Sequence, residues 1–437
     1  MTNYYTLLES LVENKEARIA VIGLGYVGLP LAKAIAESGF KNIIGLDIDS
    51  KKVELINSGR AVIDTFTKND VDELLSSGFD ATTDYSSLSE ADVLIICVPT
   101  PLNQYKEPDI SFITSTLKEA VNHLKKGSFL SLESTTWPGT TEEVIGSMLT
   151  EHGFSIGEDI FLGYSPERED PGNEEYTTHT IPKVVSGQSL NCLNIAKILY
   201  SSFIKQIVPV SDTKTAELVK LLENIQRSVN IGLMNEMKFI SDRMGINIFE
   251  VINAAATKPF GFMEYYPGPG VGGHCIPVDP YYLTWKAKEF NFHTKFIELA
   301  GEINDSVPDY IINKSISVLN RYKKSIAESK ILVLGLSYKK NVGDLRESPN
   351  LRVLQGLIDN GANAHFSDPF FKKIPQLRKY SLDMTCADIN KNEIESYDLI
   401  LLLTDHDDFD YELIEKYSKH IIDARGRLKP GKKVTYA

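Results

Sequence analysis

The chain has 437 residues, more than one ordinary hydrophobic core accommodates, so its length predicts two or three domains. Its hydrophobic content of 42% and charged content of 24% are typical of a folded soluble protein. The net charge of −13 argues against a nucleic-acid partner, and neither a membrane-spanning apolar run nor a signal-peptide pattern is found, so we expect a cytoplasmic protein without membrane contact.

The first motif is a glycine-rich turn between a strand and a helix. The run RIAVIGLGYVG (18–28) predicts a strand followed by GxGxxG, and a helical pattern over 29–38 comes next. The glycines are Gly23, Gly25 and Gly28. A second strand carries Asp47 nineteen residues past Gly28, where an acid hydrogen-bonds the ribose of NAD and repels the 2′-phosphate of NADP. This context predicts an NAD-binding Rossmann fold; a tight turn without a ligand is the alternative.

The following apolar runs extend this fold to about residue 210. Strands are predicted at DVLIICV (92–98), GSFLSLES (127–134), DIFLGYS (159–165) and KQIVPV (205–210), separated by helical stretches. The alternation predicts a parallel, doubly wound sheet in a first domain over 1–210. Ligands of such sheets bind beyond the carboxyl ends of the strands, so we expect residues 97–101 and 133–140 at the cofactor.

One long helical pattern over 212–244 opens a middle domain, which we place at 211–315. Glu217, Lys220 and Asn224 lie three and four residues apart and share one helix face. On that spacing alone, a solvated face with a weak Glu–Lys ion pair is the better interpretation.

A second Rossmann-like start appears at residue 330. KILVLGLSY (330–338) repeats the pattern of RIAVIGLGY (18–26) but lacks the glycine fingerprint. Ser348 and Pro349 predict the start of a helix, and later apolar runs complete a domain over 316–437. The predicted fold class is α/β, with two Rossmann-like doubly wound domains joined by a long central helix and a small helical domain.

The stretch PGPGVGGHCIPVDP (267–280) places Cys275 among four prolines and four glycines. Glycine lets a ligand approach the backbone, and a nucleophilic thiol needs such access. The four cysteines show no CxxC pairing, so neither a metal site nor a disulfide framework is expected. A nicotinamide enzyme with a nucleophilic cysteine suggests aldehyde oxidation through a thiohemiacetal and a thioester.

From about residue 17 to its end, the chain resembles the nucleotide-sugar 6-dehydrogenases, the UDP-glucose/GDP-mannose dehydrogenase family. Seven motifs occur in the family's order: GLGYVGLP, CVPTP, EST, PER, AELVKLLEN, GVGGHCIPVDP and SYKKNVGDLRESP. The family oxidises the C6 alcohol of a nucleotide sugar to a carboxylate with two NAD. The resemblance therefore implies a UDP-sugar substrate and a role in surface polysaccharide synthesis, such as that of a capsule.

The resemblance also implies catalytic roles. Cys275 is the nucleophile that forms the thiohemiacetal and the thioester. Lys220, with Asn224 and Asp279, holds a water and stabilises oxyanions at C6. Glu167 is the acid–base group of thioester hydrolysis. Taken alone, a loop acid such as Glu167 is more often structural, as is a loop histidine.

Further positions are implied as binding residues, with Thr135 also a polar contact beside the catalytic acid. The cofactor set is Gly23, Gly25, Tyr26, Val27, Gly28, Asp47, Lys52, Pro99, Thr100, Thr135 and Arg346. The substrate set is Glu167, Arg168, Lys220, Asn224, Gly272, Gly273, His274, Lys339 and Arg425, of which Lys339 and Arg425 match positions at the UDP moiety. Family members pair through the long helix, so we expect a homodimer.

The chain departs from plain UDP-glucose dehydrogenases on the sugar side. Those enzymes usually read Pro-Glu-Phe-Leu where this chain reads PEREDPGN, with Arg168 after the glutamate. They also carry an arginine ahead of the glycine loop, whereas this chain has none between Arg243 and Arg321. PEREDPGN resembles the branch that acts on UDP-N-acetylhexosamines, and we favour UDP-N-acetylglucosamine. The alternatives are UDP-N-acetylmannosamine or UDP-glucose, a two-electron hydroxyacid-type dehydrogenase, and a non-catalytic nucleotide-sugar sensor.

Overall fold

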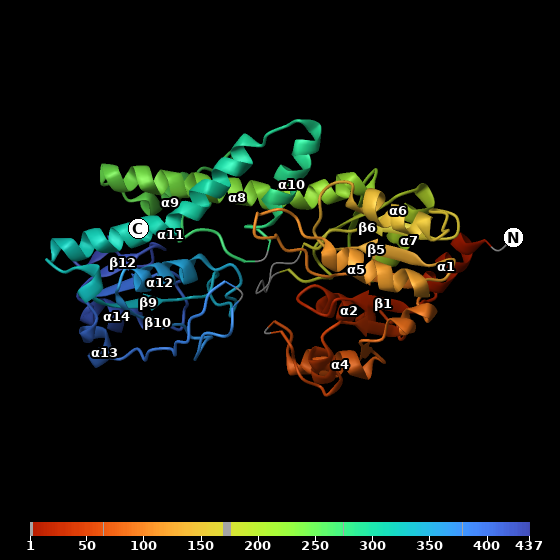
Figure 1. Ribbon diagram of the computed structural model, residues 1–437, viewed down its shortest axis with the longest axis horizontal. Coiled ribbons are helices and arrows are strands. Elements are labelled where there is room, and N and C mark those ends of the chain that lie inside the picture. Colours follow the sequence, from red (N-terminus) through yellow and green to blue (C-terminus); the bar gives the residue numbers. More distant parts are fainter. Residues whose placement is uncertain (1–2, 64, 169–175, 274, 378) are drawn as a thin grey trace. The chain divides into compact units, whose positions relative to one another are not determined.

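A computed structural model describes residues 3–63, 65–168, 176–273, 275–377 and 379–437 (Figure 1). Its contacts group the chain into two compact units, which are described separately. The first unit comprises residues 1–223 and 281–292, and the second comprises residues 224–280 and 293–437. The three-domain division at residues 210 and 315 stays a prediction.

The first unit is built on an eight-stranded sheet with the order β3-β2-β1-β4-β5-β6-β7-β8. Its strands are β1 (Ile19–Ile22), β2 (Ile43–Leu46), β3 (Asp80–Thr82), β4 (Val93–Ile96), β5 (Phe129–Leu132), β6 (Phe161–Tyr164), β7 (Lys183–Gly187) and β8 (Ile207–Pro209). Strands β1, β4, β5 and β6 are buried along their whole length, as expected for strands covered on both faces. The predicted doubly wound Rossmann-like fold is confirmed.

Helices cover both faces of this sheet (Figure 1). One face packs against α1 (Tyr4–Glu13), α2 (Gly28–Glu37), α3 (Ser50–Asn57), α4 (Lys68–Ser76) and α7 (Leu190–Ser201). The other face packs against η1 (Tyr85–Glu90), α5 (Ser111–Ala120), η2 (Val121–His123), the π-helix η3 (Thr140–Gly146) and α6 (Ser147–Glu151). Helix α2 begins one residue before the predicted range, so the strand–glycine–helix prediction holds.

The expectation of a wholly parallel sheet is wrong at one strand. Strand β7 was not predicted, and it runs antiparallel to β6, whereas the other pairs of this sheet are parallel. The segment KVVSG starts with a lysine and ends with a glycine, so it lacks the uninterrupted apolar run that marks a buried strand. Its reversed direction brings Lys183 to the edge at which β5 and β6 end.

The second unit contains a five-stranded parallel sheet with the order β10-β9-β11-β12-β13. Its strands are β9 (Lys330–Leu334), β10 (Asn363–Ser367), β11 (Leu399–Leu402), β12 (Ile421–Asp423) and β13 (Val434–Tyr436). Helices α11 (Lys295–Arg321) and α12 (Pro349–Asp359) cover one face, and α13 (Lys391–Ser396) and α14 (Tyr411–Tyr417) cover the other. The predicted caps of α12 are present, with Ser348 accepting the Asn350 N–H and Pro349 in the first turn.

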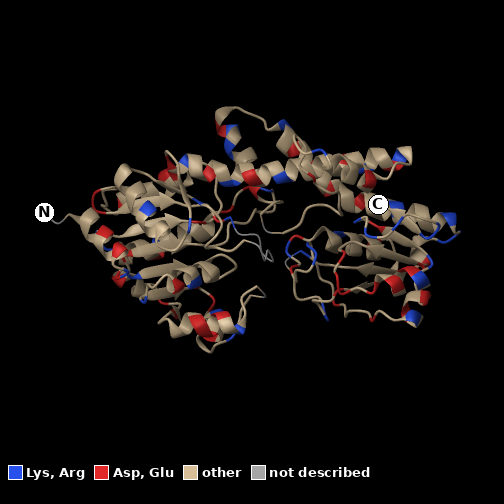
Figure 2. Ribbon diagram, turned by 180° about the vertical axis from the view of Figure 1, so that it is seen from behind, with Lys and Arg blue, Asp and Glu red and all other residues tan. Residues whose placement is uncertain are grey.

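The remaining helices form the middle of the chain. They are α8 (Thr213–Met244), α9 (Ile248–Ala256), α10 (Asp279–Ala287), η4 (Lys288–Phe290) and η5 (Ile326–Glu328). The 32-residue α8 matches the predicted helix and continues from the first unit into the second. Among the described residues no helix is both long and apolar enough to cross a bilayer. Figure 2 shows basic and acidic residues interspersed along the helices of both units.

The same hydrogen bond, from a turn N–H to an acid after the neighbouring strand, occurs in both sheets, but the turn itself differs. In the first unit, the Asp47 carboxylate after β2 accepts the backbone N–H of Leu24 at 2.9 Å. In the second, Asp368 after β10 accepts the N–H of Leu336 at 2.8 Å, the residue that matches Leu24 in the internal repeat. Asp368 also binds the backbone and hydroxyl of Ser337, which replaces a fingerprint glycine. A side chain therefore occupies the place where the first unit keeps open backbone.

We expect Asp368→Ala to destabilise the protein by about 3 kcal/mol, because it leaves buried N–H groups of Leu336 and Ser337 without an acceptor. Urea unfolding of this variant beside Asp383→Ala measures the effect. Asp383 is 88% exposed and pairs only with Lys373 among the described contacts, so its loss should cost less than about 1 kcal/mol. Equal costs in the two variants contradict the structural role of Asp368.

Candidate active site

The glycine turn before α2 is shaped to receive a dinucleotide. Gly23 has a φ of +98°, and a Cβ there would lie 2.7 Å from the Cys97 carbonyl oxygen. A Cβ at Gly28 would lie 2.0 Å from the Gly23 oxygen, whereas at Gly25 it would meet nothing within 4 Å among the described residues. The outer glycines are therefore required by packing, and the middle one leaves room for a diphosphate at the N-terminus of α2.

Asp47 directly follows β2 and is buried. Its oxygens accept the N–H groups of Leu24 and Asp49 and pair with Lys52 Nζ at 2.6 Å. Lys52 also lines a hollow of about 910 Å³ beside α3. The structure thus brings together two residues of the predicted cofactor set at the position where a Rossmann fold holds the adenosine ribose.

The remaining cofactor residues of the first unit lie at the same sheet edge. Tyr26 and Val27 precede α2, and Val27 lines a pocket of about 330 Å³ together with Glu167. Pro99 and Thr100 follow β4, and Thr135 follows the neighbouring strand β5. The Ser134 hydroxyl donates to the Val98 carbonyl at 2.7 Å and ties these two segments together.

Glu167 and Lys220 form a buried contact within the first unit. Lys220 Nζ lies 2.6 Å from the Glu167 carbonyl oxygen and 3.3 Å from its carboxylate. Both side chains are mostly buried, with 6% of Lys220 and 13% of Glu167 exposed. A buried lysine against an acid and a carbonyl is not a solvated helix face, so that interpretation is excluded for Lys220, whereas its catalytic role stays a prediction.

Glu217 lies one turn before Lys220 on α8 and has an anchoring role. Its carboxylate accepts the N–H groups of Gly139 and Thr141 and the Thr141 hydroxyl, at 2.6 to 2.8 Å. These groups open η3, so Glu217 caps that helix from the side. Burial raises the pKa of Glu217 to about 7, although the hydrogen bonds from Thr141 and Gly139 oppose the shift.

Asn224 and Cys275 are connected through Asp279 in the second unit. The Asn224 amide donates to the buried Asp279 carboxylate at 2.5 Å. The N–H groups of Val278 and Asp279 donate to the Cys275 carbonyl, which turns the chain from the half-buried cysteine into α10. The predicted residue His274 lies outside the described residues.

The glycine-rich loop before Cys275 packs against the loop that precedes α12. The Gly273 N–H donates to the Arg346 carbonyl, and Gly273 has a φ of +87°. A Cβ at Gly272 would lie 2.5 Å from Tyr338 Cβ. The glycines at 272 and 273 are therefore required by the close approach of these loops. The Arg346 guanidinium itself is held by the Asp344 carboxylate at 2.7 Å.

Arg425 and the segment of Lys339 lie together, as the predicted UDP contacts require. The Arg425 guanidinium donates to the carbonyls of Leu403 and Tyr338, the latter directly before Lys339. Its Nη1 would be 2.8 Å from a Cβ at Gly268, so the glycine loop also approaches Arg425.

Two residues of α8 that contact the glycine-rich loop, Asn235 and Lys238, were not among the predicted site residues. Lys238, only 2% exposed, donates to the Gly268 carbonyl at 3.1 Å, and Asn235 accepts the Gly268 N–H. Burial and the nearby charge of Arg425 lower the pKa of Lys238 to about 7. The helical spacing that links Glu217, Lys220 and Asn224 continues to these positions and was the available signal.

Arg168 is fixed on three sides. Its guanidinium pairs with the Glu223 carboxylate at 2.5 and 3.3 Å and donates to the Pro182 carbonyl at 2.6 Å. The side chain is 28% exposed. The residues that follow it, from Glu169 to Glu175, lie outside the described residues.

The Rossmann sheet, the glycine turn and the acid after β2 together define a dinucleotide-dependent oxidoreductase. Comparison with known proteins is consistent with this class. Residues 17–204 match the NAD binding domain of the UDP-glucose/GDP-mannose dehydrogenase family, 214–306 its central domain and 332–430 its UDP binding domain. The cofactor is NAD, and the residues of the first unit fit it.

Three relatives cover nearly the whole chain. Protein CapL of Staphylococcus aureus is 35% identical over 93% of this chain and 95% of its own. A UDP-N-acetyl-D-glucosamine 6-dehydrogenase of Pseudomonas aeruginosa is 34% identical over 90% of this chain and 92% of its own. The solved UDP-D-ManNAc dehydrogenase of Pyrococcus horikoshii superimposes with a TM-score of 0.86 at 34% identity, covering 96% of this chain and 98% of that one.

The chain belongs to the UDP-glucose/GDP-mannose dehydrogenase family, as its seven motifs indicated.

We expect Lys238→Met to remove a pH dependence of stability. Because the folded pKa of about 7 lies below the ordinary value of 10.5, both states hold the proton below pH 7. Above pH 7 the unfolded state binds more protons, so the free energy of unfolding of the wild type should rise relative to the variant by roughly 2 kcal/mol between pH 7 and 9. Urea unfolding at both pH values measures this difference, and parallel pH profiles contradict a shifted Lys238.

Proposed function

We propose that this protein oxidises the C6 hydroxyl of UDP-N-acetylglucosamine to a carboxylate, in two NAD-dependent steps through a thiohemiacetal and a thioester on Cys275. The uronic acid so formed is a precursor for surface polysaccharide synthesis. Membership in the family supports a nucleotide-sugar substrate, and the match of residues 332–430 to a UDP binding domain supports the UDP group.

The observation that carries the proposal is the polar face of α8. Lys220 binds the Glu167 carboxylate, and Asn224, one turn further, binds the Asp279 carboxylate. Asp279 in turn donates its N–H to the carbonyl of Cys275. Helix α8 therefore supplies a polar partner to each of the two acids assigned to the reaction, Glu167 in the first unit and Asp279 in the second, and a buried acid requires such a partner.

The proposed roles follow from the chemistry of these groups. NAD supplies the hydride acceptor in both oxidations. The Cys275 thiolate attacks the C6 aldehyde carbon, and the Lys220 ammonium stabilises the oxyanion that forms there. Asn224 and Asp279 hold the water through which the C6 hydroxyl proton leaves. In hydrolysis Glu167 takes a proton from water, whose oxygen attacks the thioester carbon while the carbon–sulfur bond breaks.

Arg168 is the proposed determinant of the N-acetyl group. A guanidinium has five N–H donors, and three take part in its contacts to Glu223 and Pro182. The fixed and partly exposed guanidinium suits a role as donor to the acetyl oxygen. Related proteins are named for both N-acetylglucosamine and N-acetylmannosamine, and we favour the former.

We expect UDP-N-acetylglucosamine to yield two NADH per sugar. UDP-glucose should be slower by at least roughly 10²-fold in kcat/KM, since a site built to hydrogen-bond a group discriminates against a substrate that lacks it. NADH absorbance with UDP-N-acetylglucosamine, UDP-N-acetylmannosamine and UDP-glucose tests this. UDP-glucose as the best substrate refutes the sugar proposal. One NADH per sugar identifies a two-electron dehydrogenase, and no NADH with any sugar favours a sensor.

We expect Cys275→Ser to abolish turnover and to leave NAD binding intact, because an alkoxide is far harder to form than a thiolate. The matched control is Cys386→Ser, a half-buried cysteine of the same unit with weak contacts to Ser367. Steady-state rates and NAD titration by fluorescence provide the readout. A near wild-type rate in Cys275→Ser would remove the covalent mechanism.

The exposed face of α8 supports the proposed homodimer. Large apolar side chains recur on it at helical spacing: Leu218, Leu222, Leu233, Met237, Ile240 and Met244. An apolar stripe of this length on a surface helix is typical of a helix–helix interface.

Replacing Ile240 and Met244 by glutamate should therefore convert a dimer into a monomer, because the charges would be buried in the interface. Light scattering after size exclusion measures the mass. Phe370→Glu, at a residue 44% exposed outside α8, is the control and should stay dimeric. A monomeric wild type at working concentration ends the proposal.

A further inference from the structure

A buried ion pair lies at the sheet edge from which the segment of Glu167 emerges. Strands β5, β6 and β7 are neighbours in that order. Glu133 directly follows β5, and Lys183 begins β7, which runs antiparallel to β6. The two side chains therefore meet across the end of β6, from which residues 166–168 continue.

The Lys183 ammonium group and both Glu133 carboxylate oxygens have hydrogen-bond partners. Lys183 Nζ lies 2.7 Å from one Glu133 oxygen, and the Tyr200 hydroxyl donates to the other at 2.7 Å. Tyr200 also bonds the Ser131 hydroxyl at 2.8 Å. The side chains of Lys183 and Glu133 are 10% and 1% exposed. Replacing such a pair by apolar groups often leaves stability unchanged or improved, so its presence calls for a role other than stability.

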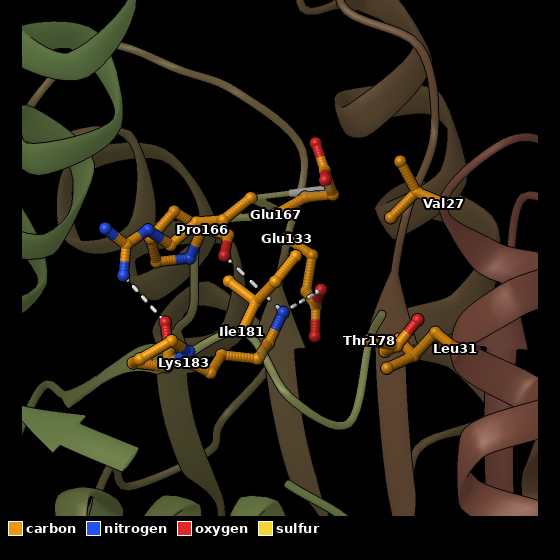
Figure 3. Close-up of a pocket in the computed structure, with 10 residues that line it drawn as sticks. Val27, Leu31, Glu133, Pro166, Glu167, Thr178, Ile181 and Lys183 are labelled. Carbon is orange, nitrogen blue, oxygen red and sulfur yellow. Dashed lines mark hydrogen bonds and ion pairs between the residues drawn. The ribbon is translucent and has the colours of Figure 1, made fainter. Parts of the chain in front are cut away.

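The pair contacts the catalytic segment. Lys183 Nζ also lies 3.4 Å from the carbonyl oxygen of Pro166, the residue before Glu167. Figure 3 shows the lysine extending between Glu133 and this carbonyl, with Val27 and Leu31 on the other side of the pocket. Lys220 holds the next carbonyl, that of Glu167, at 2.6 Å. Two ammonium groups thus hold successive carbonyls on either side of the Glu167 Cα.

We propose that Lys183, held in place by Glu133, is a positioning residue for Glu167. The inference rests on the proposed role of Glu167 in thioester hydrolysis. In that step the water oxygen must reach the thioester carbon while Glu167 takes the proton, and the thiolate leaves from the same carbon. A displacement of about 1 Å in such a group costs on the order of 10² in rate. The two proposed oxidation steps do not use Glu167, so only the rate of thioester hydrolysis should fall.

The test removes both charges together, in Glu133→Gln/Lys183→Met, so that neither is left buried without its partner. We expect kcat to fall by at least roughly 10-fold, and the KM for the UDP-sugar to fall with it, because the covalent thioester accumulates before the slowed step while kcat/KM is preserved. Intact-mass spectrometry during turnover should show a Cys275 adduct heavier by one UDP-sugar less four hydrogen atoms. A burst of two NADH per active site should precede the slow phase.

Two further variants complete the design. Lys33→Met/Asp70→Asn removes another ion pair of the first unit, at 2.6 Å, without touching residues 166–168, and should show wild-type kcat and no adduct. Tyr200→Phe keeps both charges and removes the hydrogen bond to Glu133. If the double variant does not fold, Tyr200→Phe carries the test, with a few-fold lower kcat and the same adduct.

The outcomes separate this inference from the proposed function. A wild type that forms no NADH with any UDP-sugar refutes the proposed function. A wild type that turns over, with variants that keep its kcat or lose rate without accumulating the adduct, overturns the inference alone. Accumulation of the adduct in the double variant and in Tyr200→Phe supports it.

Discussion

A polar group that is buried away from water must find a hydrogen-bond partner, and helix α8 buries a row of such groups on one face. Their partners are segments of the fold: Glu217 binds residues 139 and 141, Lys220 binds Glu167, and Asn224 binds Asp279. Further along, Asn235 and Lys238 bind Gly268. The helix therefore satisfies its own buried groups by binding Glu167 within the first unit and Asp279 and Gly268 within the second.

The same helix has large apolar side chains on its exposed face. It also buries Ala216, Leu221 and Ile225, so apolar side chains occur on both its buried and its exposed side. The exposed apolar side chains are the feature on which the proposed homodimer rests.

The two copies of the internal repeat share one hydrogen bond but differ in their glycines. Both acids, Asp47 and Asp368, accept the N–H of the leucine that follows the first glycine of the turn. In the first unit Gly25 leaves open space above the helix N-terminus, whereas in the second unit Ser337 fills the matching position and bonds Asp368. The second unit thus replaces two of the three fingerprint glycines, with Ser337 at the position of Gly25 and Lys340 at that of Gly28, and it lacks the glycine pattern that lets a diphosphate approach the helix N-terminus.

The sequence by itself determined the features that are encoded over short distances: the strand and glycine turn at 18–28, the limits of α8, and the glycine loop around Cys275. Each depends on local backbone freedom or on helical spacing, which neighbouring residues display. Only the tertiary structure decided that Lys183 lies beside Glu133, and that Lys238 is buried under Gly268. These pairs join residues 30 or 50 positions apart through the reversed strand β7 and the packing of a loop on α8. Spacing along the chain cannot indicate such contacts, because strand order and direction, rather than local pattern, bring the side chains together.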